Sequence, residues 1–258
     1  MFHKLSSTLW GLIVGIGFIV GSVLVTGQAK SFWNLPSVFI TIGGTFSAVV
    51  IAFPTQRLKK LGPTIKRAMV KDKFDIREDI AILVNLSETS RKEGLLAMED
   101  KIGEMTEDEF LKKGILLIVD GADQEQLRDF LEGETYFMQQ RHQKGAAMLD
   151  MIAATAPALG LLGTYVGLIP MLNSLEDPTA LGPMMALELV SSFYGAFIAY
   201  VVFSPLAKRL KLMNGEEVLR REIVTEGMLS IQQGKNPKML KEELYAYANI
   251  PQATELSA

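Results

Sequence analysis

The sequence predicts an all-α integral membrane protein with four transmembrane helices and a helical cytoplasmic domain between the second and third. Hydrophobic residues make up 48% of the 258 residues although 21% are charged, so apolar and charged segments are expected to be segregated. Four apolar stretches are long enough to cross a bilayer, which takes about 20 residues of helix. Basic residues are concentrated after the second and fourth of these stretches, whereas the two short loops that connect the first to the second and the third to the fourth contain only one.

The four predicted spans cover about residues 8–26, 35–53, 151–172 and 184–203. The first is longer than the apolar region of a signal peptide, about 7–15 residues, and is therefore predicted to be a retained helix. The first three spans contain no charged residue, and the fourth contains only Glu188.

The distribution of Lys and Arg predicts the orientation of the spans. The loop between the first two spans contains only Lys30, and the loop between the last two contains no basic residue. Basic residues follow the second and fourth spans: Arg57, Lys59, Lys60, Lys66, Arg67, Lys208, Arg209 and Lys211. Both termini are therefore expected in the cytoplasm, as in a multi-pass protein of the cytoplasmic (inner) membrane.

The predicted organisation has four parts: residues 1–53 with two spans, 54–150 as a cytoplasmic helical domain, 151–205 with two spans, and 206–258 as a cytoplasmic helix and tail. Apolar residues at spacings of three and four predict helices in the second part. Thr106 and Glu109 resemble a capping box that would open a helix at Phe110. The last helix of this part is expected to continue into the third span.

Hydroxyl groups in the last two spans are the main candidates for an ion path. Thr155 and Thr164 lie in the third span, and Ser191 and Ser192 lie in the fourth. Counted from the outer ends, Thr164 and Ser192 are each about 12 Å deep, so antiparallel helices would present both at one level. Such oxygens suit a partly dehydrated cation or a short water chain. The alternative is that each hydroxyl bonds to its own helix backbone.

Glu188, one helical turn outward of Ser192, is the only carboxylate in a predicted span. A charge there is costly, which favours a function, although a side chain that reaches the outer surface is the alternative. No carboxylate lies near mid-membrane, so a titrating group for ion transport would come from another chain or be Glu188.

Other classes of protein are disfavoured. The chain has no Cys and only two His, His3 and His142, so no metal site is expected. The net charge of −3 gives no reason to expect nucleic acid as a partner. No catalytic residue pattern or resident cofactor motif is present, so an enzyme is not expected.

Small residues and prolines also mark the spans. Glycines repeat at four-residue spacing in the first and third spans, which allows close packing within one subunit or between subunits of an oligomer. Pro157 lies in the third span and Pro205 at the inner end of the fourth, where each is a fixed kink or a moving hinge.

Several motifs together resemble one known family. They are SRKEGLLAMED at 90–100, EFLKKGILLIVDGADQEQLRDFLEGETYFMQQRHQKG at 109–145, APALGLLGTYVGLIPML at 156–172, LGPMMALELVSSFYGAFIAY at 181–200 and FSPLAKRLK at 203–211. The chain resembles the MotA/PomA family of flagellar motor stator A subunits, within the MotA/TolQ/ExbB proton channel superfamily.

The resemblance implies an assembly with other proteins. Five A subunits would surround two copies of a MotB/PomB-type B subunit, which supplies the aspartate that binds the transported ion. Ion flow would then drive rotation and torque on the rotor switch protein FliG. The ion is a proton or a sodium ion; Ser192, where sodium users tend to have threonine, leaves the choice open with protons favoured.

The resemblance also implies residue roles. Arg91 and Glu99 match a charged pair that engages the rotor, and eight residues apart on one helix they would share nearly one face. Pro157 and Pro205 match prolines that couple ion flow to movement, and Thr164 and Ser192 match hydroxyls near the ion route. No role is implied for Glu188.

Two alternatives remain open. A TolQ/ExbB-like ion-driven energiser of the cell envelope would have three spans and an outside N-terminus. A passive membrane scaffold without ion flux would tolerate replacement of its hydroxyls.

Overall fold

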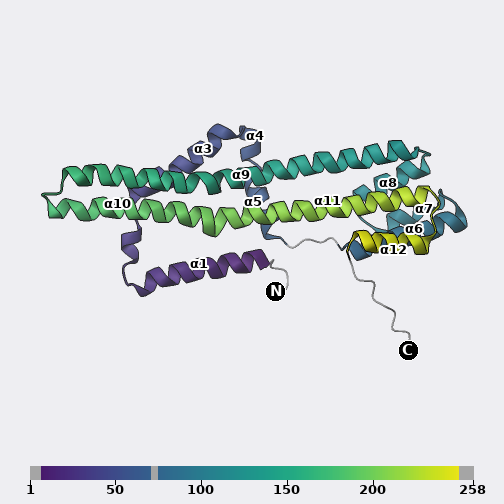
Figure 1. The fold of residues 1–258 in the computed structure, drawn as a ribbon, viewed down its shortest axis with the longest axis horizontal. Helices are drawn as coiled ribbons and strands as arrows, with labels where there is room; N and C mark the ends of the chain where they lie inside the picture. The colour runs from purple at the N-terminus through teal and green to yellow at the C-terminus, as the bar shows by residue number, and fades with distance from the viewer. Residues whose placement is uncertain (1–6, 71–74, 250–258) are drawn as a thin grey trace, which may run out of the picture. The chain divides into compact units, whose positions relative to one another are not determined.

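The computed structural model describes residues 7–70 and 75–249. The described residues form helices joined by turns and short loops, with no strand among them, and the chain divides into two compact units. The first unit comprises Met1–Asp72 and His142–Leu212, and the second comprises Lys73–Arg141 and Met213–Ala258. Figure 1 shows that two long helical rods, α9 and α10 to α11, carry the chain from one unit to the other.

The predicted all-helical membrane fold is confirmed, because four helices are long and apolar enough to span a membrane. The first is α1 (Ser7–Val25), and the second is built from η2, α2, η3 and α3 over Ala29–Ala52. The third lies within α9 (Gln124–Asn173), which runs without interruption from the second unit as predicted. The fourth lies within a continuous helix over Leu181–Gln232.

This continuous helix consists of α10 (Pro178–Ala196), the π-helix η4 (Phe197–Phe203) and α11 (Ser204–Gln232). Pro205 is the second residue of α11, two positions after the end of η4. A proline has no N–H to donate and its ring clashes with the carbonyl four residues earlier, so the wider π-helical turn lies where an α-helical turn is least favourable. A second π-helix, η3 (Val38–Gly43), interrupts the second span between α2 (Leu35–Ser37) and α3 (Gly44–Ala52).

Two short helices follow the second span, α4 (Thr55–Leu58) and α5 (Leu61–Met69). Ala68 of α5 is fully buried and packs with Leu149 of α9 and with Leu206 and Ala207 of α11. The chain therefore folds back against the start of the third span and the end of the fourth span before it enters the second unit.

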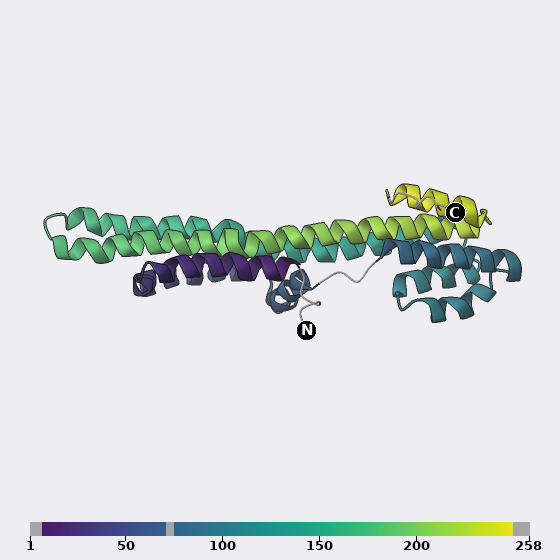
Figure 2. The ribbon, with the colours of Figure 1, turned by 90° about the horizontal axis from the view of Figure 1, so that it is seen from below.

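The second unit contains α6 (Ile76–Glu93), α7 (Ala97–Met105), α8 (Glu109–Val119) and α12 (Pro237–Tyr247), with the first part of α9 and the last part of α11. Figure 2 shows α6, α7 and α8 lying one beside the other. Apolar side chains from all six segments form one core. On α11, Gly227 leaves room for Leu83 of α6, whose Cδ1 lies 2.7 Å from where a Cβ would be built.

The predicted capping box at Thr106 is wrong. The helix begins at Glu109, and its cap is Asp108, whose Oδ1 accepts a hydrogen bond from the Phe110 N–H at 2.7 Å. Thr106 Oγ1 instead accepts from the Asp108 N–H at 3.1 Å. A capping box requires the acidic side chain at the third helical position, whereas Glu109 occupies the first.

Candidate functional site

The third and fourth spans pack closely along a line of glycines. A Cβ at Gly163 of α9 would overlap Ser191 Oγ of α10, and one at Gly167 would lie 2.8 Å from the Met184 carbonyl oxygen. A Cβ at Gly195 of α10 would lie 2.5 Å from the Ala156 carbonyl oxygen. At these positions the two helix backbones are in direct contact, which glycine permits because it has no side chain.

Pro157 lies at the end of this contact that is nearest the start of the third span. The Pro157 Cα would lie 3.1 Å from a Cβ built at Gly195. The proline is therefore located where α9 and α10 are in close contact. Sequence reasoning found the glycine repeat at 163 and 167 but missed Gly160 and Gly195. Gly195 has no glycine at four-residue spacing in its own span and is paired only across the helix contact.

The second span is held to α10 by hydroxyl groups that the sequence analysis did not select. Ser37 Oγ donates to the Leu187 carbonyl oxygen at 3.2 Å, and Thr41 Oγ1 donates to the Ser191 carbonyl oxygen at 3.3 Å. Both side chains are completely buried. The available signal was their four-residue spacing, which continues to Thr45 and places all three on one helix face.

Ser191 and Ser192 have different surroundings. Ser191 is completely buried beside Gly163, and within the described residues its Oγ has no hydrogen-bond partner. Ser192 is only half-buried. An ion that moves along the outside of this subunit could therefore reach Ser192 but not Ser191.

The threonines of the third span bond to their own helix. Thr155 Oγ1 donates to the Met151 carbonyl oxygen and Thr164 Oγ1 to the Leu161 carbonyl oxygen, each at 2.7 Å. Both side chains are half-buried. Their oxygens keep lone pairs that can accept a proton or contact a cation.

The expected common depth of Thr164 and Ser192 is wrong by about one helical turn of 5.4 Å. The Ser192 Cα lies 3.3 Å from a Cβ built at Gly160, and Thr164 lies about one helical turn farther along α9. The residue count assumed a fourth helix that begins near Met184, whereas α10 begins at Pro178. The membrane roles of these hydroxyls stay predictions.

Glu188 is half-buried at the same helix contact. Its N and Cβ would lie 3.1 and 3.3 Å from a Cβ at Gly167, so that glycine makes room for the first atoms of the glutamate. Glu188 and Ser191 therefore lie on the side of α10 that contacts α9.

Arg91 and Glu99 are both exposed, and among the described residues neither forms an ion pair. Arg91 lies in the last turn of α6 and Glu99 in the first turn of α7. The expectation that they share one helix face is wrong because Gly94, at φ +91°, ends α6 between them. Their charges belong to two helices in contact and are unpaired within the described part of this chain.

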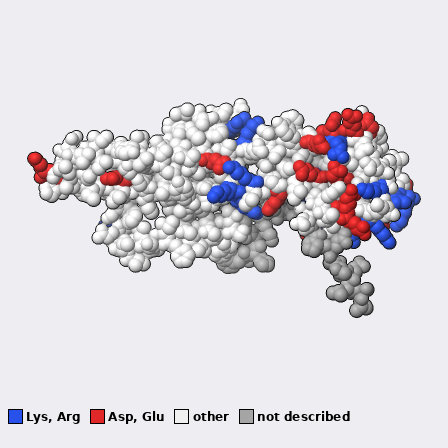
Figure 3. Space-filling view, in the orientation of Figure 1, with Lys and Arg blue, Asp and Glu red and all other residues white. Residues whose placement is uncertain are grey.

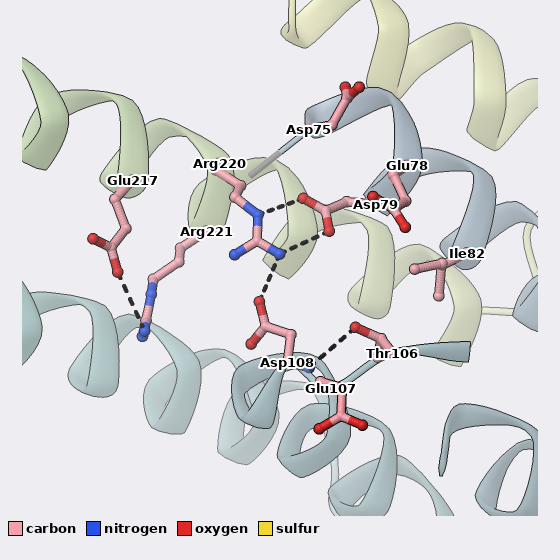
Figure 4. Close-up of a pocket in the computed structure, with 10 residues that line it drawn as sticks. All are labelled: Asp75, Glu78, Asp79, Ile82, Thr106, Glu107, Asp108, Glu217, Arg220 and Arg221. Atoms are coloured by element: carbon pink, nitrogen blue, oxygen red, sulfur yellow. Dashed lines mark hydrogen bonds and ion pairs between the residues drawn. The ribbon is translucent and has the colours of Figure 1, made fainter. Parts of the chain in front are cut away.

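A buried ionic cluster joins three helices of the second unit (Figure 4). Arg220 of α11 donates through Nε and Nη2 to both oxygens of Asp79 of α6, and Nη2 also lies 2.6 Å from Asp108 Oδ2 at the start of α8. Burial alone would lower the pKa of Arg220, but hydrogen bonds and charge attraction from Asp79 and Asp108 raise it above its usual value. Arg220 therefore stays charged and fixes α6 and α8 on α11.

Charged side chains gather over the second unit, whereas the surface over α10 is almost free of them on the face shown in Figure 3. Among the described residues, no group of three or more His, Asp or Glu side chains is placed to hold a metal ion. The arrangement can supply uncharged oxygens in the spans and charges at α6 and α7.

Two family models match this chain. The MotA/TolQ/ExbB proton channel family matches residues 103–223, and the Motility protein A N-terminal family matches residues 9–94. The chain is 38% identical to Motility protein A of Borreliella burgdorferi over 250 residues, covering 96% of this chain and 95% of that protein. It is 33% identical to Chemotaxis protein PomA of Vibrio alginolyticus, covering 94% and 95% of the two chains.

A solved structure is also similar. One chain of the flagellar MotAB stator complex from Bacillus subtilis matches with a TM-score of 0.85 and 37% identity, covering 93% of this chain and 95% of that one. The four spans, the helical unit between them and near full-length similarity in sequence and fold lead to one assignment. The chain belongs to the MotA/PomA motility proteins of the MotA/TolQ/ExbB proton channel family.

Proposed function

We propose that this protein is the A subunit of an ion-driven flagellar stator in the inner membrane. The observation that carries the proposal is the match to a MotAB stator complex over nearly the whole of both chains. Similarity to motility proteins extends through the N-terminal spans as well as the channel region. This favours a stator over a three-span envelope energiser.

A MotB/PomB-type B subunit is the proposed partner. The described parts of the four predicted spans contain a single carboxylate, Glu188, which lies at the contact with Gly167 of α9. A partner aspartate would supply the group that binds and releases the ion. We propose two B subunits within a ring of five A subunits; in this chain alone α1 has no buried residue, which leaves its surface for lipid or neighbouring subunits.

The proposed ion is the proton, with sodium as the alternative. The ion passes Thr164 and Ser192, which are half-buried and bear oxygens, before it reaches the partner aspartate. The membrane potential contributes about 2.3 kcal/mol per charge for each 100 mV. Thr155 and Glu188 are proposed to contact the same route, whereas the complete burial of Ser191 favours packing.

Torque is proposed to pass to the rotor switch protein FliG through Arg91 and Glu99. Movement of the fourth span reaches the second unit through one helix, because residues 181–232 form a continuous rod. Arg220 on this rod holds the first turn of α6, and Arg91 lies in its last turn, about 18 Å away at 1.5 Å per residue. Pro157 of α9 and Pro205 of α11 are proposed as the positions at which these two helices change their bend during the movement.

Deletion and complementation in the native host test the function. Swimming and the torque of tethered cells should be lost on deletion and restored by the wild-type gene. Normal swimming together with an envelope defect would support an envelope energiser and contradict our proposal. Because the chain has no Cys, single cysteines at Ser7 and Gly27 would also report topology: labelling from outside is expected only at Gly27.

A further inference from the structure

The first unit carries a set of exposed basic side chains for which no acidic partner is described. The set, called here the basic collar, comprises Arg57, Lys59, Lys60, Lys66, Lys144 and Lys208. All six are exposed, and within the described ranges none forms an ion pair. Figure 3 shows blue side chains gathered near the middle of the view, where α5 lies in Figure 1, with red side chains beside them.

Packing brings the collar together from three parts of the chain. The apolar side of α5, with Ala68 at 0% exposure, rests on Leu149 of α9 and Leu206 of α11. The opposite side of α5 carries Lys66. Thr64 of α5 lies 3.4 Å from where a Cβ would stand at Gly145, next to Lys144 in sequence.

The carboxylates of the first unit do not neutralise the collar. Four are described, and Glu176, Asp177 and Glu188 lie in the loop and helix at the opposite end of the spans. The fourth, Asp150, is already paired with Lys211 at 2.7 Å. The collar is therefore a concentration of positive charge that no described acidic side chain of the unit offsets.

The position of the collar indicates its ligand. The second span ends at Ala52, and Arg57, Lys59 and Lys60 follow within eight residues. Side chains so close to the end of a span reach the phosphate groups of the adjoining leaflet. Each basic residue near an anionic bilayer surface strengthens binding by up to about fivefold.

We propose that the basic collar binds the headgroups of anionic phospholipids in the cytoplasmic leaflet and so selects the lipids around the subunit. The ligand class is a phosphodiester headgroup with net negative charge, such as phosphatidylglycerol. Binding is electrostatic and exposed, so high salt weakens it, since the screening length falls to about 3 Å at 1 M.

The test uses the full chain, copurified with its B-type partner and reconstituted in phosphatidylcholine vesicles. Electron spin resonance compares how strongly trace spin-labelled phosphatidylglycerol and spin-labelled phosphatidylcholine associate with the protein. We expect a preference for phosphatidylglycerol of about fivefold at low salt, disappearing near 1 M salt. Added inorganic phosphate should not compete at matched ionic strength, because free phosphate lacks the acyl chains that place a headgroup at the collar.

Matched variants assign the preference to the collar. Replacing Arg57, Lys59, Lys60 and Lys66 together by Gln should remove most of the preference, whereas replacing each by the other basic residue should keep it. The control removes the same charge from the second unit through Arg77→Gln, Lys92→Gln, Lys238→Gln and Lys241→Gln, and should leave the preference unchanged.

Two results would overturn the proposal: no preference in the wild type, or an equal loss in the control. Since removal of basic residues can disturb insertion, the double variant Lys144→Gln and Lys208→Gln provides a second test away from the end of span two. It should lower the preference by a smaller factor, and an unchanged value would also count against the collar. The measurement does not involve rotation, so it separates lipid binding from stator function.

Discussion

Arg220 on α11 donates hydrogen bonds to both carboxylate oxygens of Asp79 on α6, although the two residues are 141 positions apart in the sequence. Both side chains are 7% exposed, and Asp108 completes the cluster from the start of α8. This contact joins the helix that continues from the fourth span to the helix that carries Arg91. It is the ionic link between the proposed driving and rotor-facing elements.

Removal of this link should destabilise the second unit. Arg220→Met would leave Asp79 and Asp108 buried without a positive partner, at an expected cost of about 3–5 kcal/mol. Arg220→Lys should recover only part of this, because an ammonium group cannot bond both carboxylate oxygens in the same planar geometry. Thermal unfolding of the purified protein measures the loss, with exposed Arg77→Met as control; equal stability of Arg220→Met and the control would contradict this account.

The glycine contact between the third and fourth spans predicts a compensating pair. Gly163→Ala would place a methyl group against Ser191 Oγ and should cost about 1–3 kcal/mol of packing. Adding Ser191→Gly removes the atoms that clash and should restore assembly, measured as recovery of the complex by size-exclusion chromatography. Gly17→Ala, where a Cβ would meet nothing within 4 Å, is the control. If the double variant assembles no better than Gly163→Ala alone, the clash with Ser191 is not the cause.

The proposed ion path predicts a loss of flux without loss of fold. Thr164→Val keeps the shape of the side chain and removes its oxygen, and Ser192→Ala does the same for the fourth span. Together they should slow ion-driven rotation while membrane abundance stays the same, because neither hydroxyl bonds another helix in the described contacts. Unchanged rotation in the double variant would favour a passive scaffold.

The identity of the ion has its own measurement. Swimming speed recorded against external sodium at constant pH should stay level if protons drive the motor. A strict dependence on sodium, with swimming stopped by a sodium-channel blocker, would instead assign the Thr164 and Ser192 oxygens to a sodium path.

The rotor-facing charges predict a recoverable defect. Arg91→Glu with Glu99→Arg should impair swimming, since both side chains are exposed and free of ion pairs among the described residues. Matching charge reversals on the rotor protein should restore part of the motility, because complementary charge would be regained. Lys92→Glu, which changes the next residue of α6, serves as control. Normal motility in the double variant alone would remove the pair from this role.

The connection between α11 and α12 predicts a pH dependence. Glu243 accepts hydrogen bonds from Lys235 and from the Tyr247 hydroxyl, and these hold its pKa below the usual value of 4.5. Because the folded state has the lower pKa, this contribution is fully present above about pH 4.5 and is lost as pH falls through the lowered pKa. Unfolding followed between pH 6 and 3 should show a shallower loss in Glu243→Gln than in the wild type. If Glu243→Gln loses as much stability as the wild type over this pH range, or if exposed Glu242→Gln behaves like Glu243→Gln, the role of Glu243 is contradicted.

The sequence alone predicted four spans, the continuous helix into the third span and the family. These depend on local properties: the length of an apolar run, the period of a helix and motifs that are contiguous in the chain. Because the thickness of the bilayer sets the length of a transmembrane helix, the length of each apolar run directly predicts a membrane-spanning helix. The orientation and the ion path rest on the same local signals and stay predictions.

Only the tertiary structure decided which side chains meet. It buried Ser191 but left Ser192 half-exposed, separated Thr164 from Ser192 by a turn, and placed Arg91 and Glu99 on two helices. It also brought Asp79, Asp108 and Arg220 together. The physical reason is that helix contacts depend on the axial offset and rotation of packed helices, which are set by side-chain packing across the fold. Local periodicity fixes the face of a residue on its own helix but not its partner on another.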